Sequence, residues 1–302
     1  MLTARPRGVQ AHATGPSGGE RAPDGPTPHN GTAMSPPGSV SPRPLPVALA
    51  LAVTLLGVGA MFAGGAFAPR LGFGLRAQIA FGTFLLALPA LGALAARPPA
   101  WLAAAGRPLS RRSLALSGLL GAALWVGSVG LMELQSAVWP PDPQYLEMFR
   151  SLHRALAPSG PLDALVSVAV IAVLPGLCEE LVVRGLLLPS LARALTGAGA
   201  VVFSAALFAA MHGDSYRFAF TFVVGLVFGA LRLRTGSLWP PVVAHVTLNT
   251  LTFLIAPLVD DPEQAYNPQP ALGLACLVAG SAVAWPLLRA LRPSVDSPGS
   301  AA

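Results

Sequence analysis

LDALVSVAVIAVLPGLCEELVVRGLLLPSLARAL, residues 162–195, decides the fold because it is long enough and apolar enough to cross a membrane as a helix. Asp163 is its one acid near the start, and a long apolar run separates it from Glu179 and Glu180. Arg184 follows about one helical turn later. Ionisable groups inside a membrane-length helix are energetically expensive, so their default interpretation is functional. The stretch therefore predicts polar partners for these groups elsewhere in the chain.

The composition is that of a membrane protein. Of the 302 residues, 53% are hydrophobic and 11% are charged, whereas soluble domains carry roughly 25% charged residues. The apolar runs predict an all-α, polytopic membrane helix bundle with about eight transmembrane helices. The predicted segments are 45–68, 77–96, 114–138, 162–190, 198–212, 217–233, 238–257 and 271–288. The fourth is long and the fifth and sixth are short, which indicates tilt or packing inside the bundle.

Three regions are predicted along the chain. Residues 1–44 are rich in Pro, Gly and Ser and hold almost no large apolar residues, so we expect them to be disordered. Residues 45–292 form the transmembrane helical domain, and residues 293–302 form a flexible tail. Small residues in GLLGAALWVGSVG, residues 118–130, and in FVVGLVFGAL, residues 222–231, predict notches where helices pack closely.

Every basic residue is an arginine, and the net charge is +6. The arginines are scattered at segment ends instead of forming a patch, so no nucleic-acid partner is expected. The positive-inside rule favours both termini in the cytoplasm. The inner regions then hold Arg43, Arg97, Arg107, Arg111, Arg112, Arg193, Arg232, Arg234, Arg289 and Arg292, and the outer loops hold Arg70, Arg76, Arg150, Arg154 and Arg217. The Ala- and Gly-rich, lysine-free composition is typical of a GC-rich bacterial genome, which predicts a multi-pass protein of the inner or plasma membrane.

Glu180 and Arg184 are four residues apart, so they share one helix face and are expected to pair there. Such a pair lowers the cost of holding either charge in the membrane. Glu179 lies about 100° around the helix and is free to point elsewhere. A further acid, Glu133 in LMELQSAVWP, lies near the outer end of the third segment, where it is interpreted as an interfacial carboxylate.

Two later segments carry polar side chains at the same spacing. FAAMH places Phe208 and His212 on one helix face, and HVTLN does the same for His245 and Asn249. The ring of Phe208 is therefore expected to pack beside the imidazole of His212.

A carboxylate, two imidazoles and an amide are sufficient for hydrolysis by water. A carboxylate beside a histidine deprotonates water as a general base, and a histidine and an asparagine donate hydrogen bonds to the oxyanion of a tetrahedral intermediate. Cys178 adjoins Glu179, but apolar surroundings disfavour its thiolate, so we interpret it as a packing residue. With Cys276 as the one other cysteine, neither a disulfide framework nor a cysteine metal site is expected.

Each polar feature also has a purely structural interpretation. Glu180 and Arg184 would then only fix a helix register. His245 and Asn249 would only join neighbouring helices by hydrogen bonds. His212 borders the polar turn GDSYR and would be an interfacial histidine.

The series EExxxR, FxxxH and HxxxN, in this order on successive membrane helices, resembles the CPBP family. This is the CAAX protease and bacteriocin-processing group, also called Abi, and it includes intramembrane glutamic endopeptidases. The stretch LRLRTGSLWPPVVAHVTLN also resembles the sequence that usually leads into the third motif in this family. The resemblance covers about residues 162–257.

The resemblance implies a role for each matching residue. Glu179 would be the general base, with His212 helping to activate the water, and the oxyanion would be stabilised by His245 and Asn249. The supporting residues would be Glu180, Arg184, which holds the acidic pair, and Phe208, which positions His212. The implied substrate is a peptide bond near or within the membrane, in a membrane-anchored or CAAX-like protein or in a bacteriocin leader. Membrane lipid is the other expected partner.

A metal-free site without a cofactor is favoured over a zinc site. One Glu, two His and one Asn would suit zinc in principle, but the chain has no HExxH motif.

Two other protein classes stay open. A non-catalytic membrane peptide-binding or immunity protein would tolerate Gln in place of Glu179. A transporter would show a second copy of the polar motifs, and no such copy is found.

One geometric expectation conflicts with this site. At about 1.5 Å per residue, Glu179 lies roughly 26 Å along the fourth segment from the outer side, and His212 lies about 22 Å along the fifth from the inner side. A straight, upright bundle would then separate the two in depth by roughly 10 Å or more. They meet only if the fourth helix starts outside the membrane or if helices tilt or break, and Pro175–Gly176 would permit a kink.

Overall fold

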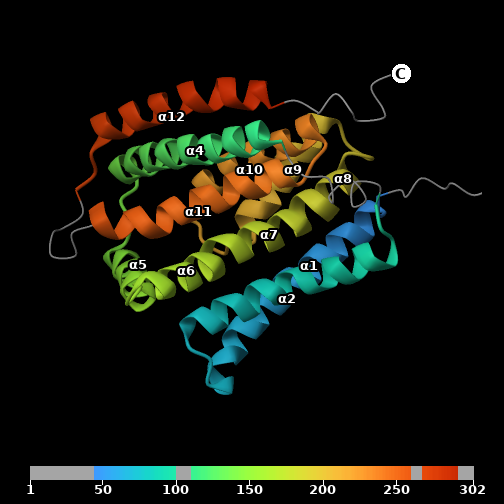
Figure 1. Ribbon diagram of the computed structural model, residues 1–302, viewed down its shortest axis with the longest axis horizontal. Coiled ribbons are helices and arrows are strands. Elements are labelled where there is room, and N and C mark those ends of the chain that lie inside the picture. Colours follow the sequence, from blue (N-terminus) through green and yellow to red (C-terminus); the bar gives the residue numbers. More distant parts are fainter. Residues whose placement is uncertain (1–43, 100–109, 260–266, 292–302) are drawn as a thin grey trace, which may run out of the picture. The chain divides into compact units, whose positions relative to one another are not determined.

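The computed structural model describes residues 44–99, 110–259 and 267–291, and every described element is a helix (Figure 1). The all-α prediction is therefore confirmed for this part of the chain. The predicted tails, apart from Pro44, lie outside the described residues. All eight predicted segments contain helix. Their bounds are α1 Val47–Phe67, α2 Leu75–Ala96, α4 Arg111–Val138, α6 to α8 Pro161–Leu191, α9 Gly197–Ala210, α10 Phe218–Thr235, α11 Trp239–Val259 and α12 Pro270–Ala290.

Six of these helices are long and apolar enough to cross a membrane, judged by length and composition within the described residues. They are α1 with its 3-10 extension to Leu71, α2, α4, the continuous helix α6 to α8, α10 and α12. The composition and these helices are those of a multi-pass membrane protein. The predicted count of about eight spans is not confirmed, because α9 has only 14 residues and α11 is not among the six.

Residues 143–156 form a helix, α5 Pro143–Leu156, where the sequence analysis expected an outer loop. The helix starts on strong local signals: the Asp142 carboxylate accepts a hydrogen bond from the Gln144 N–H at 2.7 Å, and Pro143 occupies the first turn. His153 and Arg154 lie in its last turn, where positive charge suits the helix dipole. The expectation of a loop was wrong because only membrane-length apolar runs were counted as helices.

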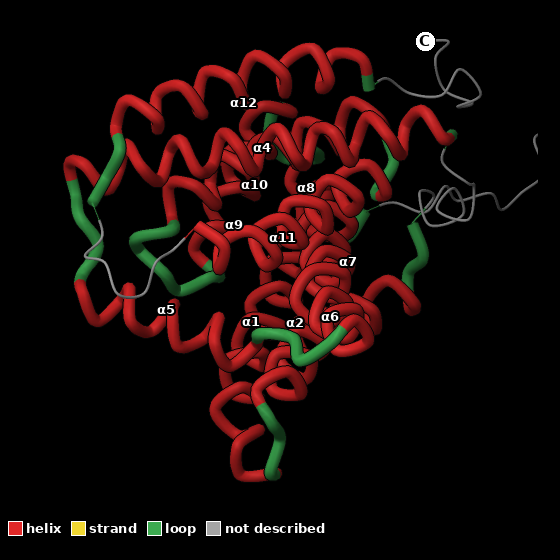
Figure 2. The backbone as a smooth tube through the Cα atoms, turned by 60° about the vertical axis from the view of Figure 1, so that its left-hand side comes forward, coloured by secondary structure: helices red, strands yellow, loops and turns green. Residues whose placement is uncertain are grey.

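The predicted glycine notches are confirmed. α4 and α12 lie side by side and antiparallel (Figures 1 and 2), and a side chain at Gly280 would meet the backbone nitrogen of Gly127 at 2.5 Å. α9 and α10 make a similar approach, since a side chain at Gly225 would meet the Cβ of Ala205 at 3.0 Å. Small residues thus set the spacing of both helix pairs.

The fourth predicted segment is a single helix that contains two π-helical pieces. The α-helical piece α7, Leu174–Glu180, lies between two π-helical pieces, Ala169–Val173 and Leu181–Leu187. Pro175 has no N–H to donate to the preceding turn, and the wider π turns accommodate such local mismatches. With 31 residues, the whole helix is on the order of 45 Å long, against roughly 30 Å for the hydrocarbon layer. It therefore either tilts or extends beyond that layer.

Two hydrophobic clusters flank the middle of this helix. One joins its residues Val182 and Leu187 with α1, α2 and α9 and includes Phe208. The other joins α4, α10 and α11 around Phe228 and Leu248. The polar residues of the predicted site lie between these two clusters.

Candidate active site

The buried ion pair between Glu180 and Arg184 forms the base of the site. Both side chains are fully buried, and Arg184 Nη1 donates to Glu180 Oε1 at 2.9 Å, so the predicted pairing is confirmed. Arg184 Nη2 also donates to the carbonyl oxygen of Gly225 at 3.0 Å. Its guanidinium carbon lies 4.4 Å from the ring centre of Phe208, a cation–π contact. These contacts offset the high cost of removing two charges from water.

Glu180 also binds His245, a contact that the sequence analysis did not predict. His245 Nδ1 lies 2.9 Å from Glu180 Oε1, the oxygen that already accepts from Arg184. An ionised carboxylate only accepts hydrogen bonds, so His245 Nδ1 carries the proton in this pair. The pair joins α11 to the fourth predicted segment.

Glu179 points away from this ion pair and toward two imidazoles. Its Oε2 lies 4.0 Å from His212 Nε2 and 3.8 Å from His245 Nε2. This oxygen is buried and has no hydrogen-bond partner among the described residues. Polar atoms separated by more than 3.5 Å are often bridged by water, and a buried carboxylate oxygen without a partner is energetically costly. The geometry therefore suits a water molecule between Glu179 and the histidines.

His212 is held with a defined tautomer. Its Nδ1 lies 2.8 Å from the carbonyl oxygen of Phe208, which only accepts, so Nδ1 carries the proton. The neutral ring then presents the lone pair of Nε2 to Glu179. The ring of Phe208 packs edge-on against the imidazole at 5.0 Å between centres, as predicted.

The predicted depth conflict between Glu179 and His212 is resolved by the fold. Their polar atoms lie 4.0 Å apart, so the straight, upright bundle was the wrong assumption. α9 ends at Ala210, and His212 lies in the turn that follows. Gly213 in the same turn has a φ of 64°, a left-handed backbone conformation that favours glycine. The short α9, together with the change of winding around α7, brings the two residues to one level.

Asn249 lies one turn after His245 on the same face of α11 and is partly buried. Its amide makes no hydrogen bond with the other candidate residues in the described structure. Six of the seven predicted residues are linked by contacts in the structure: Glu179, Glu180, Arg184, Phe208, His212 and His245.

The structure adds two residues that the sequence analysis did not place in the site. Arg232 was interpreted as a marker of the inner membrane face, but it is buried and its Nε donates to the carbonyl oxygen of Arg184 at 3.3 Å. Phe228 was not singled out, yet its ring centre lies 5.2 Å from that of His245. Both lie on α10, as does the notch at Gly225. That notch was the sequence signal that could have indicated close packing of α10 against the site.

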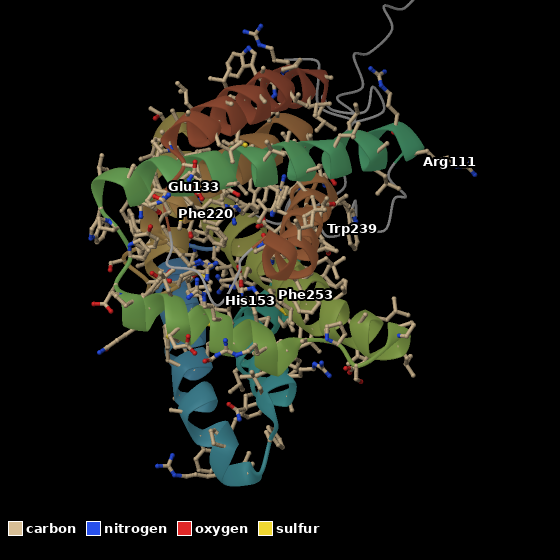
Figure 3. All side chains as sticks on the ribbon, turned by 90° about the vertical axis from the view of Figure 1, so that its left-hand side faces the viewer. Arg111, Glu133, His153, Phe220, Trp239 and Phe253 are labelled. Atoms are coloured by element: carbon tan, nitrogen blue, oxygen red, sulfur yellow. The ribbon has the colours of Figure 1, made fainter. Side chains whose placement is uncertain are left out.

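Glu133 lies on α4, a helix that carries none of the seven predicted site residues (Figure 3). Its Oε2 accepts from the backbone N–H of Gln269 at 2.7 Å, at the residue that precedes α12. A carboxylate at a helix N-terminus is favourable. This position fits the predicted interfacial carboxylate.

No group of three or more His, Cys, Asp or Glu side chains in the described residues is arranged to hold a metal ion. A cavity of about 460 Å³ is present, but none of the seven predicted site residues lines it. Val224 and Val227 line that cavity, while Gly225 and Phe228 of the same helix contact Arg184 and His245.

Comparison with known families places these contacts in context. Residues 161–251 match the family model described as type II CAAX prenyl endopeptidase Rce1-like. This segment is similar to the Rce1-like family. No curated protein and no solved structure matches the chain. The Rce1-like segment contains all seven predicted site residues and runs from the start of α6 into α11. The resemblance stated from the three motifs is thereby confirmed.

Proposed function

We propose that the protein is an intramembrane endopeptidase that hydrolyses a peptide bond with a water molecule activated by Glu179 and His212. The observation that carries the proposal is the buried, unpartnered Oε2 of Glu179, which faces the Nε2 atoms of His212 and His245 at 4.0 and 3.8 Å. The Rce1-like match supports the reaction class.

The attacking water is placed between two acceptors. One O–H of the water donates to Glu179 Oε2 and the other to the lone pair of His212 Nε2. Glu179 takes the first proton as the water oxygen bonds to the carbonyl carbon of the substrate, which gives a tetrahedral oxyanion. The same carboxyl then returns the proton to the leaving amine as the C–N bond breaks. No covalent bond to the enzyme forms in this scheme.

His245 and Asn249 are proposed to stabilise the oxyanion. His245 Nδ1 is occupied by Glu180, so Nε2 donates a hydrogen bond only when the ring is an imidazolium. Glu180 serves as its counter-ion, and Arg184 orients Glu180. The side-chain amide of Asn249 supplies the second donor from the same face of α11.

We propose that the reaction needs neither metal nor cofactor. The proposed substrate is a membrane-anchored or CAAX-like peptide or protein, and the surrounding partner is membrane lipid. The proposed location is the inner or plasma membrane, with both termini in the cytoplasm.

The test uses the full-length protein in detergent and a fluorogenic library of membrane-anchored peptides. We expect the wild type to cut, Glu179→Gln and His212→Ala each to lose about 10²–10⁴-fold in rate, and a strong chelator to have no effect. Loss of cutting on chelation would establish a metal site. A folded Glu179→Gln variant with wild-type activity would exclude the proposed base. Peptide binding without cleavage by the wild type would favour a non-catalytic binding protein.

A further inference from the structure

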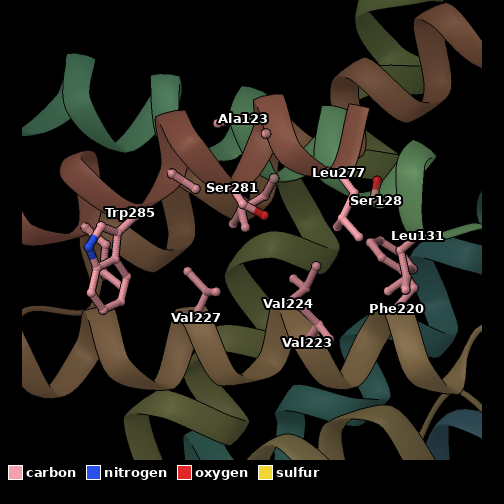
Figure 4. A pocket seen from close by; sticks show the side chains of 15 residues that line it. Ala123, Ser128, Leu131, Phe220, Val223, Val224, Val227, Leu277, Ser281 and Trp285 are labelled. Atoms are coloured by element: carbon pink, nitrogen blue, oxygen red, sulfur yellow. The ribbon is translucent and has the colours of Figure 1, made fainter. Parts of the chain in front are cut away.

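The cavity between α4, α10 and α12 has an almost entirely apolar lining. Its volume is about 460 Å³. Among the described residues that line it, only Ser128, Ser281 and the indole of Trp285 carry polar side-chain atoms (Figure 4). An apolar cavity of about 150 Å³ accommodates benzene, so this volume suits roughly three times as many carbon atoms. That is the size of a lipid acyl chain. Trp285 and Ser281 are exposed, so the cavity opens to the surroundings of the bundle.

The walls of the cavity are held apart by the helix packing itself. α12 already touches α4 through Gly280 and Gly127 and has no room to move closer. α12 is tied to α10 where both helices end, because Arg234 Nε donates to the carbonyl oxygen of Leu288 at 3.1 Å and its Nη2 donates to that of Arg289 at 3.3 Å. The cavity lies between these contacts.

The cavity matches one leaflet of a bilayer in depth. Its α12 wall runs from Leu277 to Leu288, which is roughly 16 Å of helix, about half of the hydrocarbon thickness. All three walls belong to candidate membrane spans. One end of the cavity, at Trp285 and Leu288, lies in the last turns of α12 (Figure 4).

Positive charge surrounds that end. The guanidinium of Arg289 lies 4.5 Å from the ring centre of Trp285, which lines the cavity. Arg234 uses two of its guanidinium nitrogens for the carbonyls of α12, and a guanidinium has five N–H donors. Among the described residues this end of the bundle also carries Arg97, Arg111, Arg112 and Arg193 and no acidic residue. Arg111 and the acidic Glu133 lie toward opposite ends of α4 (Figure 3).

We propose that this cavity binds one acyl chain of an anionic phospholipid, whose phosphate lies against Arg234 and Arg289. The apolar lining and the one-leaflet depth fit the chain. The arginines fit the negative headgroup, as basic pockets between membrane helices do. The site is separate from the proposed peptidase site, since Val224 and Val227 line it from a different face of α10 than Gly225 and Phe228. The proposal does not depend on whether the protein cuts peptides.

The test is equilibrium binding of phosphatidylglycerol with a fluorescent acyl chain to the delipidated, full-length protein in neutral detergent. We expect unlabelled phosphatidylglycerol to displace the probe well, phosphatidylcholine to displace it poorly, and inorganic phosphate to displace it hardly at all. Equal displacement by phosphatidylcholine would overturn the headgroup site. Displacement by inorganic phosphate as effective as by the lipid would show an anion site without a chain.

Two pairs of variants locate the site. Ser281→Phe fills the cavity and should weaken binding by about tenfold, whereas Val283→Phe is a control at an exposed α12 position that does not line it. Arg234→Gln and Arg289→Gln should each weaken binding by about fivefold, whereas Arg97→Gln is a control at the same end. Thermal unfolding of each variant checks its fold. Wild-type binding by folded Ser281→Phe, or equal losses in the controls, would overturn the proposal.

Discussion

At the scale of residues, Arg184 shows how a full charge is kept inside the bundle. Its guanidinium pairs with Glu180, donates to the carbonyl oxygen of Gly225 and makes cation–π contacts with the rings of Phe208 and Phe228. Every one of these contacts uses the flat, multidentate shape of arginine. The same contacts fix Glu180, which in turn holds His245. Arg184 therefore connects the stability of the bundle to the geometry of the candidate site.

We expect Arg184→Met to lower the free energy of unfolding by about 3–5 kcal/mol, because Glu180 is left buried without a cationic partner. The double variant Arg184→Met with Glu180→Gln should recover much of this loss, since no uncompensated charge is then buried. Denaturant titration in detergent measures both values. A single variant as stable as the wild type would contradict this account of the pair.

The predicted site residues could be recognised from the sequence because polar groups are costly, and therefore rare, in membrane-spanning helices. Glu179, His212 and His245 come together as the order of the motifs suggested. The bond between Glu180 and His245 could not be predicted, because the spacing to Arg184 already satisfied Glu180 locally. The burial of Arg232 was not predicted, because an arginine in the last turn of a span normally marks the membrane surface.

At the scale of elements, α5 and the end of α4 hold the turn that carries His212. The Tyr145 hydroxyl donates to Asp214 Oδ2 at 2.8 Å, and Asp214 Oδ1 accepts from the backbone N–H groups of Tyr216 and Arg217. Gln135 of α4 donates to the carbonyl oxygen of Tyr216 at 2.7 Å. A helix that the sequence analysis treated as a loop thus steadies the turn next to the site.

Burial and the Asp214 carboxylate raise the pKa of Tyr145 well above its ordinary value. A raised pKa in the folded state means that the folded protein loses stability as pH rises above about 10, the value for an unfolded tyrosine. Tyr145→Phe should flatten this alkaline decline, although burial also raises the pKa of Tyr216. The midpoint of thermal unfolding, followed from pH 8 upward, measures the effect. Identical curves for the variant and the wild type would refute it.

The close contact of α4 and α12 depends on glycine. We expect Gly280→Val to destabilise the bundle by about 1–3 kcal/mol, because the new side chain meets the backbone of Gly127 and forces the helices apart. Gly92→Val in α2 is the matched control, since a Cβ at Gly92 has no neighbour within 4 Å. Thermal unfolding of both variants distinguishes the two positions. An equal loss in both would indicate helix propensity instead of packing.

At the scale of the whole molecule, the Rce1-like segment supplies the candidate site, and α1, α2, α4 and α12 lie outside it. The positions of all eight predicted helices followed from apolar runs. The relative depths of these helices in the bundle could not be predicted from the apolar runs, because depth depends on the changes of winding around α7 and on the shortness of α9. A sequence pattern at a fixed 3.6-residue period does not report such changes.

The most direct measurement compares Glu179→Gln with Glu133→Gln on the same membrane-anchored peptide. Glu133 is a carboxylate that contacts the start of α12 and lies outside the cluster, so it controls for the loss of an acidic group. We predict that Glu179→Gln lowers the cleavage rate by about 10²–10⁴-fold while Glu133→Gln cuts at nearly the wild-type rate. Equal rates for the two folded variants would contradict the assignment of Glu179 as the base.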